Sequence, residues 1–253
     1  MLKKGILVSI IFTLSLFCIF SACKKQQPTV VKKITATTDA EFQPMEYVDE
    51  NGNIAGFGID MFKAIAKEGG FEVEFIKQPW EGIFDRLTAG QYDAIISSVT
   101  ITDERKQTMD FSMPYVTCGQ ILVVKKDNNT VTKLSQLDGK KVGALRETTG
   151  VEEIKKNSKI IPKEYDEIGL AISDLANGRI DAVVCDSPIA GHYVLKDPKY
   201  NQLLKIAGDI FTTEQYGIAV KKGNTELLDL INNGLQKVQG KGIDKDLERK
   251  WLK

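Results

Sequence analysis

The 253-residue sequence contains a single histidine, His192. A metal site built from several histidines is therefore excluded, and a Ser-His-Asp or Cys-His mechanism would depend on this one residue. Because a lone histidine without catalytic partners usually has a structural or surface role, we expect that role for His192. The sequence also lacks a basic excess, since 34 Lys and Arg balance 34 Asp and Glu. This balance argues against nucleic-acid binding, and we expect neither a metal nor a cofactor.

Long apolar runs are missing except at the N terminus. Lys3 and Lys4 precede an apolar stretch at residues 5–20, and two small residues, Ser21 and Ala22, follow it. This order is typical of an export signal. A permanent membrane helix would need about 20 apolar residues, so the shorter run favours export.

Residues 20–23 resemble the lipobox of bacterial lipoproteins, although Phe20 stands where leucine is usual. The resemblance implies that Cys23 begins the mature chain and carries lipid, which holds the protein at the membrane. We therefore interpret residues 1–23 as the signal region and residues 24–30 as a polar tether. The protein is expected to face outside the cytoplasm, in the periplasm or on the outer face of the cell membrane.

Cysteine is also scarce, since only Cys118 and Cys185 lie beyond the signal region. An oxidising compartment permits a disulfide between them. The sequence does not place their Cα atoms within bonding reach, so the pairing stays open.

An internal repeat predicts two lobes of similar construction. LTAGQYDAIISS at residues 87–98 matches LANGRIDAVVCD at 175–186, and each reads as a helix end, a Gly stop and a buried strand. Upstream, KKITA at 32–36 matches KKVGA at 140–144, and both are expected to be opening strands. Apolar residues at helical spacing over 59–68 predict a helix that Gly69 and Gly70 end.

Alternating helices and strands favour an α/β fold in which each lobe has a mostly parallel sheet with flanking helices. The first lobe is predicted to comprise residues 31–115 and 216–253, and the second lobe residues 119–211. Two crossing strands, at 115–119 and 211–216, would form the hinge.

The repeat places Ser98 and Asp186 at equivalent strand ends, where α/β sheets bind ligands. Thr102 caps a predicted helix start, with the Thr100 hydroxyl nearby, and Arg105 can grip a carboxylate through two hydrogen bonds. Residues 147–152 predict a second helix start with free N–H groups. A carboxylate clamp combined with an acid at Asp186 describes a site for an α-amino acid zwitterion.

These residues resemble the periplasmic binding proteins for polar amino acids, especially the glutamine-, histidine- and lysine/arginine-binding members. The matching strings are GFGID (56–60), YDAIISSVTITDER (92–105), DFSMPY (110–115) and GRIDAV (178–183). The resemblance implies a two-lobed periplasmic binding protein-like fold, a free amino acid as ligand, an ABC transporter permease as partner, a monomer, and no enzymatic activity. It also implies a set of ligand-binding residues: Asp39, Phe42, Phe57, Trp80, Ser98, Thr100, Arg105, Thr149 and Asp186.

Within that set, the resemblance gives the carboxylate to Arg105, with Ser98 and Thr100 flanking it and Thr149 meeting it from the second lobe. The α-ammonium goes to Asp186, and Phe57 and Trp80 form an aromatic wall. The sequence departs from the family pattern at three positions: Glu147 where Gly is common, Cys185 directly before the acid, and Glu41 beside the specificity loop. We expect Glu41 to be solvated rather than part of the site.

Asp39 beside aromatic rings favours a basic amino acid, arginine, lysine or histidine, because a cation gains about 0.5–2 kcal/mol over such a ring. Glutamine remains an alternative, since Asp39 can also accept from an amide. A cyclic-acid dehydratase on the same fold would need a positioned general acid or base. A sensor would need a separate partner protein, because no signalling domain follows Lys253 in this sequence.

Overall fold

The computed structural model describes residues 32–253. The predicted signal region, the lipidated Cys23 and the tether lie outside these residues. No helix within 32–253 has the length and apolar character needed to cross a bilayer.

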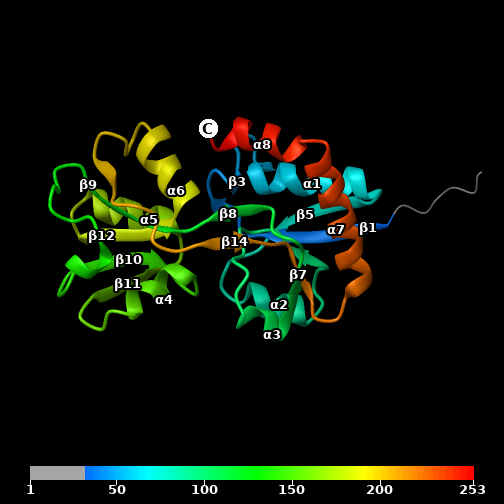
Figure 1. Cartoon of the computed structure of the whole chain (residues 1–253), viewed down its shortest axis with the longest axis horizontal. Helices are drawn as coiled ribbons and strands as arrows, with labels where there is room; N and C mark the ends of the chain where they lie inside the picture. Colours follow the sequence, from blue (N-terminus) through cyan, green and yellow to red (C-terminus); the bar gives the residue numbers. More distant parts are fainter. Residues whose placement is uncertain (1–31) are drawn as a thin grey trace, which may run out of the picture. The chain divides into compact units, whose positions relative to one another are not determined.

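The described residues form two α/β lobes, each built around its own five-stranded sheet (Figure 1). The first sheet has the order β5-β1-β6-β15-β7. The elements of this lobe are β1 (Lys33–Thr38), β2 (Glu41–Phe42), β3 (Glu46–Val48), β4 (Ile54–Ala55), α1 (Phe57–Gly69), β5 (Glu72–Lys77), α2 (Ile83–Thr88), β6 (Ala94–Ile95), α3 (Arg105–Thr108), β7 (Met109–Phe111), β15 (Ala219–Lys221), α7 (Thr225–Gly240) and α8 (Ile243–Trp251).

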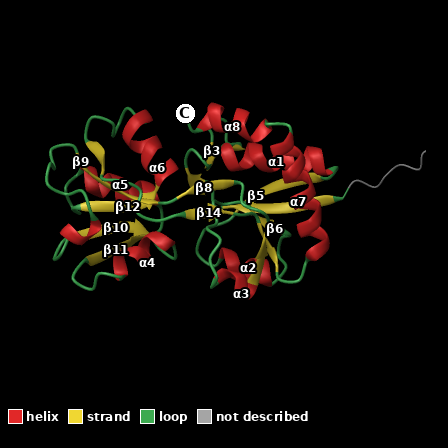
Figure 2. Ribbon diagram, in the orientation of Figure 1, coloured by secondary structure: helices red, strands yellow, loops and turns green. Residues whose placement is uncertain are grey.

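The second sheet has the order β11-β10-β12-β9-β13, which repeats the topology of the first. Its elements are β9 (Gln120–Lys125), a 3-10 turn (Leu134–Gln136), β10 (Lys141–Leu145), α4 (Thr149–Lys155), β11 (Ile161–Tyr165), α5 (Ile168–Ala176), β12 (Ala182–Asp186), α6 (Ser187–Gly191), a π-helical turn (His192–Lys196) and β13 (Leu204–Ala207). Figure 2 shows helices beside the strands of both lobes.

The prediction of mostly parallel sheets is confirmed, because four of the five strands in each sheet run in the same direction. One strand of each sheet, β15 in the first and β9 in the second, runs antiparallel to both of its neighbours. In each, two neighbouring pairs are parallel and two are antiparallel. The antiparallel pairs arise where the chain enters a sheet from the other lobe, through β9 in one and β15 in the other.

Two short strands connect the lobes. β8 (Val116–Cys118) pairs antiparallel with β14 (Glu214–Tyr216), and both are seen between the sheets in Figure 1. The lobe boundaries and the bending of this connection stay predictions.

The internal repeat corresponds to equivalent structure in both lobes. Gly90 and Gly178 have φ of 75° and 72°, left-handed values that glycine adopts without strain. The upstream match, however, is out of register by two residues. Ala94 of β6 lies opposite Ala36, whereas Ala182 of β12 lies opposite Val142 and not opposite residue 144. A shift of two residues keeps the same side chains facing the core, so the hydrophobic pattern does not reveal it.

The predicted helix at residues 59–68 is confirmed within α1, and Gly70 ends it in the left-handed conformation with φ 75°. Its buried face contributes to one hydrophobic cluster that includes residues of both lobes.

Candidate functional site

A cavity lies between the two lobes, with an empty volume of about 350 Å³ that includes open solvent. Eight of the nine predicted ligand-binding residues line this cavity, with three residues outside that set, Ser97, Leu145 and Thr148. The eight are Asp39, Phe42, Trp80, Ser98, Thr100, Arg105, Thr149 and Asp186.

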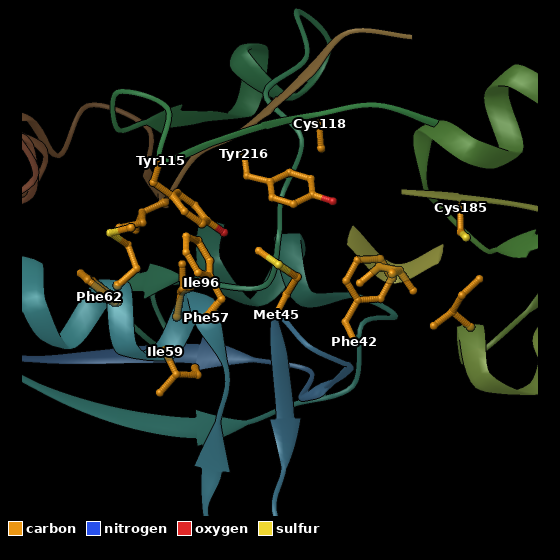
Figure 3. Packing of buried hydrophobic residues seen from close by; sticks show 14 of the residues in the cluster. Phe42, Met45, Phe57, Ile59, Phe62, Ile96, Tyr115, Cys118, Cys185 and Tyr216 are labelled. Atoms are coloured by element: carbon orange, nitrogen blue, oxygen red, sulfur yellow. The ribbon is translucent and has the colours of Figure 1, made fainter. Parts of the chain in front are cut away.

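Phe57 is the exception, and its expected place in the aromatic wall is corrected. Its side chain is fully buried and stacks on Tyr115, with ring centroids 6.4 Å apart. Figure 3 shows both rings inside the packed cluster. The ring faces the core because Phe57 is the first residue of α1, and the buried face of that helix begins with it.

Arg105 crosses the cavity from the first lobe to the second. Its Nη1 donates to the Thr100 carbonyl at 2.9 Å, and its Nη2 donates to the Glu147 carbonyl at 3.1 Å. The backbone N–H of Arg105 donates to Thr102 Oγ1 at 3.1 Å, so this threonine satisfies the helix start as predicted. Burial lowers the pKa of the guanidinium, which nevertheless stays charged.

Aromatic rings support this arginine. Its guanidinium carbon lies 5.0 Å from the centroid of Phe84 and 5.9 Å from that of Trp80. Trp80 also donates from Nε1 to the Arg146 carbonyl of the second lobe at 3.1 Å. Trp80 therefore both walls the cavity and contacts the opposite lobe, whereas Phe84 was not indicated by the sequence.

Two cavity loops have non-glycine residues in the left-handed region. Ser98 has φ 50° and Glu147 has φ 56°. Such backbone is uncommon outside glycine and tends to occur at functional sites. The value at Glu147 explains why glycine suits this position, where the sequence departs from the family pattern.

The two lining aspartates sit in surroundings that oppose their ionisation. Burial raises the pKa of Asp39 to about 6, although Asp39 Oδ1 accepts from the Glu41 N–H at 2.7 Å. Burial, with the nearby charge of Glu214, raises the pKa of Asp186 to about 7. Gln120 Nε2 donates to Asp186 Oδ1 at 3.1 Å. A cation in the cavity would relieve both costs.

Two buried glutamates lie behind the cavity wall. Glu46 is fully buried, its two carboxyl oxygens lie 3.2 and 2.9 Å from Ser98 Oγ, and burial raises its pKa to about 8. A protonated Glu46 can donate to Ser98 and leave the serine hydrogen for a ligand. Glu214 instead accepts from Thr100 Oγ1 and Thr149 Oγ1, both at 2.9 Å.

These glutamate contacts change the role expected for the threonine hydroxyls. A hydroxyl carries one hydrogen, so a threonine that donates to Glu214 can only accept from a ligand through its side chain. Among the groups predicted to meet a carboxylate, Arg105 is the cationic donor.

The remaining predicted features lie away from the cavity lining. Glu41 is exposed and forms an ion pair with Lys77. His192 is half-buried, with its ring edge against Tyr193 at a centroid distance of 5.3 Å. Cys118 and Cys185 are buried free thiols, which Figure 3 shows on separate elements. From residue 32 onward, no cluster of three or more His, Cys, Asp or Glu is arranged to hold a metal ion.

Comparison with known proteins bears on the whole described chain. The model of a family described as bacterial extracellular solute-binding proteins, family 3, matches residues 34–253. The chain is 38% identical over 216 residues to the "Probable histidine-binding protein" of Neisseria gonorrhoeae. The matched region covers 83% of this chain and 80% of that protein.

Solved structures are similar at the same level. An ancestral arginine-binding protein bound to arginine is 42% identical, with a TM-score of 0.82 over 87% of this chain and 98% of that one. The ancestral amino acid-binding protein AncCDT-1, a precursor of cyclohexadienyl dehydratase, is 37% identical, with a TM-score of 0.81 over 87% and 96% of the two chains. The matched region includes every residue that lines the cavity.

Proposed function

This chain belongs to the bacterial extracellular solute-binding proteins, family 3, and from that premise we propose that it captures a free polar amino acid in the interlobe cavity. The amino acid is basic, namely arginine, lysine or histidine. The loaded protein delivers it to the permease of an ABC transporter. The family acts outside the cytoplasm, so capture takes place there.

The two ends of an α-amino acid fit opposite charges of the cavity. Arg105 supplies a guanidinium for the α-carboxylate, a pairing that forms two parallel hydrogen bonds in suitable geometry. Asp186, which is buried and accepts a hydrogen bond from Gln120, takes the α-ammonium. These two contacts leave Asp39 for the side chain of the ligand.

The observation that carries the basic specificity is the charge of the lining. Asp39 and Asp186 line the cavity, and Arg105 is the one cationic side chain in its wall among the described residues. A zwitterion neutralises Arg105 and Asp186, whereas a ligand with one further positive charge also neutralises Asp39. Phe42 and Trp80 offer faces over which that charge is favourable.

Delivery requires no chemical step, and we propose that the protein is not an enzyme. One structurally similar protein is a precursor of a dehydratase, so we propose to test whether this protein converts a prephenate-like acid. We expect no conversion of it, since the acids in the cavity are placed to meet a cation rather than to move a proton.

The membrane attachment is part of the same proposal. A monomeric mature chain would begin at a lipidated Cys23, and residues 24–30 would tether the described lobes. Mass spectrometry of the mature N terminus should find acyl chains on Cys23. An unmodified N terminus would remove the lipid anchor from the account and leave amino-acid capture intact.

The test of the function is calorimetry on the chain from Lys24, unfolded and refolded to strip bound ligand, against the twenty amino acids. We expect tight binding of arginine, lysine or histidine. Arg105→Ala and Asp186→Ala should each weaken it by about 100-fold or more, because each leaves a buried charge of the ligand unpaired. Glu81→Gln, an exposed change, is the control.

Binding of glutamine alone would keep the capture function and overturn the basic specificity. Binding of no amino acid would overturn the function itself. Retention of full affinity in both Arg105→Ala and Asp186→Ala would move the ligand to another site.

A further inference from the structure

The connection between the lobes carries a buried carboxylate that no ligand contact requires. Glu214 is the first residue of β14 and is 8% exposed. Its Oε2 accepts from Thr100 and Thr149, and its Oε1 accepts from Thr212 at 3.0 Å. Three hydroxyl donors thus surround one acid side chain.

The donors come from different parts of the fold. Thr100 belongs to the first lobe, and Thr149 opens α4 of the second lobe. The two hydroxyls lie 2.9 Å from the same oxygen of Glu214. One carboxylate oxygen on the connecting strand therefore joins both lobes, and separating the lobes must lengthen at least one of these bonds.

The hydrogen bonds continue from Glu214 to the acid end of the cavity. Thr149 Oγ1 also accepts from Gln120 Nε2 at 3.2 Å. The same Nε2 donates to Asp186 Oδ1 at 3.1 Å, and Gln120 is fully buried. An unbroken chain thus runs from Thr100 through Glu214, Thr149 and Gln120 to Asp186.

We propose that Glu214 is a positioning residue that couples closure of the lobes to the alignment of the amino-acid-binding groups. The proposal rests on the function proposed above. Hydrogen bonds to a carboxylate are stronger than neutral ones, and the bonds from Thr100 and Thr149 can form together only when the lobes meet. Glu214 therefore slows release of a bound amino acid and leaves the rate of capture by the open form unchanged.

The opposite role is physically possible and gives the opposite result. Glu214 could compete with the α-carboxylate of the ligand for the hydroxyls of Thr100 and Thr149. Removing Glu214 would then free both donors and tighten binding. The sign of the change separates the two roles.

Stopped-flow binding of arginine provides the main test, with Trp80 as the reporter. The chain has two tryptophans, so a Trp251→Phe background leaves only Trp80, which bonds the opposite lobe. In Glu214→Ala we expect arginine release about 10- to 100-fold faster than in wild type, because two charge-assisted hydrogen bonds are lost. The association rate should stay within about threefold of wild type.

Two further variants separate position from charge. The amide oxygen of Glu214→Gln can still accept from both threonines, so its release rate should be closer to wild type than to Glu214→Ala. Glu152→Gln removes an exposed charge beside the same hydroxyls, and the charge of Glu152 also acts on Arg105. Because an exposed charge is screened by water, the release rate of this variant should stay within about threefold of wild type. Slower release in Glu214→Ala, or an equal effect in the Gln and Ala variants, would overturn the proposal.

A measurement without amino acid keeps this proposal separate from the ligand assignment. The bond from Trp80 to Arg146 and the Glu214 bridge use only protein atoms. We therefore expect the ligand-free Trp80 emission of Glu214→Ala to shift to longer wavelength, as the indole enters water, and that of Glu152→Gln to stay. Equal emission from all three proteins would overturn the coupling, whichever ligand the cavity binds.

Discussion

Among residues 32–253, four carboxyl groups are buried in or behind the cavity, and each has a different neighbour. Asp39 accepts from a backbone N–H, Asp186 from Gln120, and Glu214 from three hydroxyls, while Glu46 lies against Ser98. Burial of a carboxylate is costly unless a cation or hydrogen bonds compensate it. The two aspartates line the cavity and have no cationic partner among the described residues, so their cost makes the cavity a strong site for a cation.

The pH dependence of stability follows from these groups. Folded-state pKa values of about 8 for Glu46, about 7 for Asp186 and about 6 for Asp39 exceed the ordinary carboxyl values. The folded protein therefore keeps protons that the unfolded chain has lost, and its unfolding free energy should fall as pH rises from about 4 to about 8. Each group contributes at most about 1.4 kcal/mol per pH unit. Urea unfolding of the ligand-free protein across this range measures the slope, and a rising stability would contradict it.

Affinity for a cationic amino acid should have the opposite dependence. A ligand ammonium favours the ionised Asp186, so binding below about pH 7 must displace a proton. We expect arginine affinity to weaken by up to about tenfold per pH unit below neutrality for each acid involved. Calorimetry at about pH 5.5 and pH 8 measures it, and an affinity that does not change would contradict the assignment of these acids to the ligand.

Asp39 should set the preference for charge at the ligand side chain. Asp39→Asn keeps an acceptor for the Glu41 N–H and removes the negative charge. Arginine affinity should fall about 10- to 100-fold, and glutamine affinity should stay within about threefold, since an amide pairs with either residue.

The control for this substitution is Glu41→Gln, next to Asp39 but outside the cavity lining. It removes an exposed acid that pairs with Lys77, so both affinities should be unaffected. An equal loss of arginine affinity in both variants would mean that the total negative charge near the cavity, and not a direct contact with Asp39, causes the loss.

At this scale the sequence indicated the residues that line the cavity better than those that support it. Asp39, Arg105 and Asp186 lie next to recognisable strand ends and loops. Glu46 and Glu214 gave no such signal, because a glutamate is exposed by default. Their partners Ser98, Thr100 and Thr149 are 52 to 114 residues away, and Thr212 alone is a sequence neighbour. Phe57 was misplaced since a ring beside a loop can face either the cavity or the core.

Among the elements, the contact between α1 and α7 depends on one small residue. A Cβ at Gly234 would lie 2.4 Å from the carbonyl oxygen of Ile65, so α7 approaches α1 at glycine. This contact ties the C-terminal segment to the first lobe.

Gly234→Ala should therefore destabilise the protein by about 1–3 kcal/mol, the usual cost of overpacking. Gly240→Ala in the same helix is the matched control, because an added Cβ there meets nothing within 4 Å. It should be neutral or stabilise by up to about 1 kcal/mol. Urea unfolding measures both, and equal stability of the two variants would contradict the close approach.

Most elements were predictable from the sequence, and their pairing was less so. Helix α1 was indicated by apolar periodicity and by the glycines that end it. The sequence did not indicate the one antiparallel strand of each sheet, because the direction of β9 and β15 depends on which lobe the chain comes from. The upstream sequence match was shifted by two residues from the structural equivalence of β1 and β10. A shift by two residues leaves the alternation of buried and exposed side chains unchanged, so the sequence pattern does not reveal it.

At the scale of the described molecule, two lobes of equal topology meet over a polar cavity and are joined by a pair of short strands. The doubled topology presents strand ends of both sheets to one space, which is why one repeat in the sequence predicted a site with two halves. Ligand can favour closure only through contacts that exist in the closed arrangement. Arg105 contacts both lobes, and Glu214 receives hydroxyls from both.

The most direct test of the central claim is a crystal structure of the chain from Lys24 grown with arginine. The account predicts the α-carboxylate on Arg105, the α-ammonium on Asp186 and the ligand guanidinium beside Asp39, between Phe42 and Trp80. Arginine bound in the reverse orientation, or outside this cavity, would contradict it.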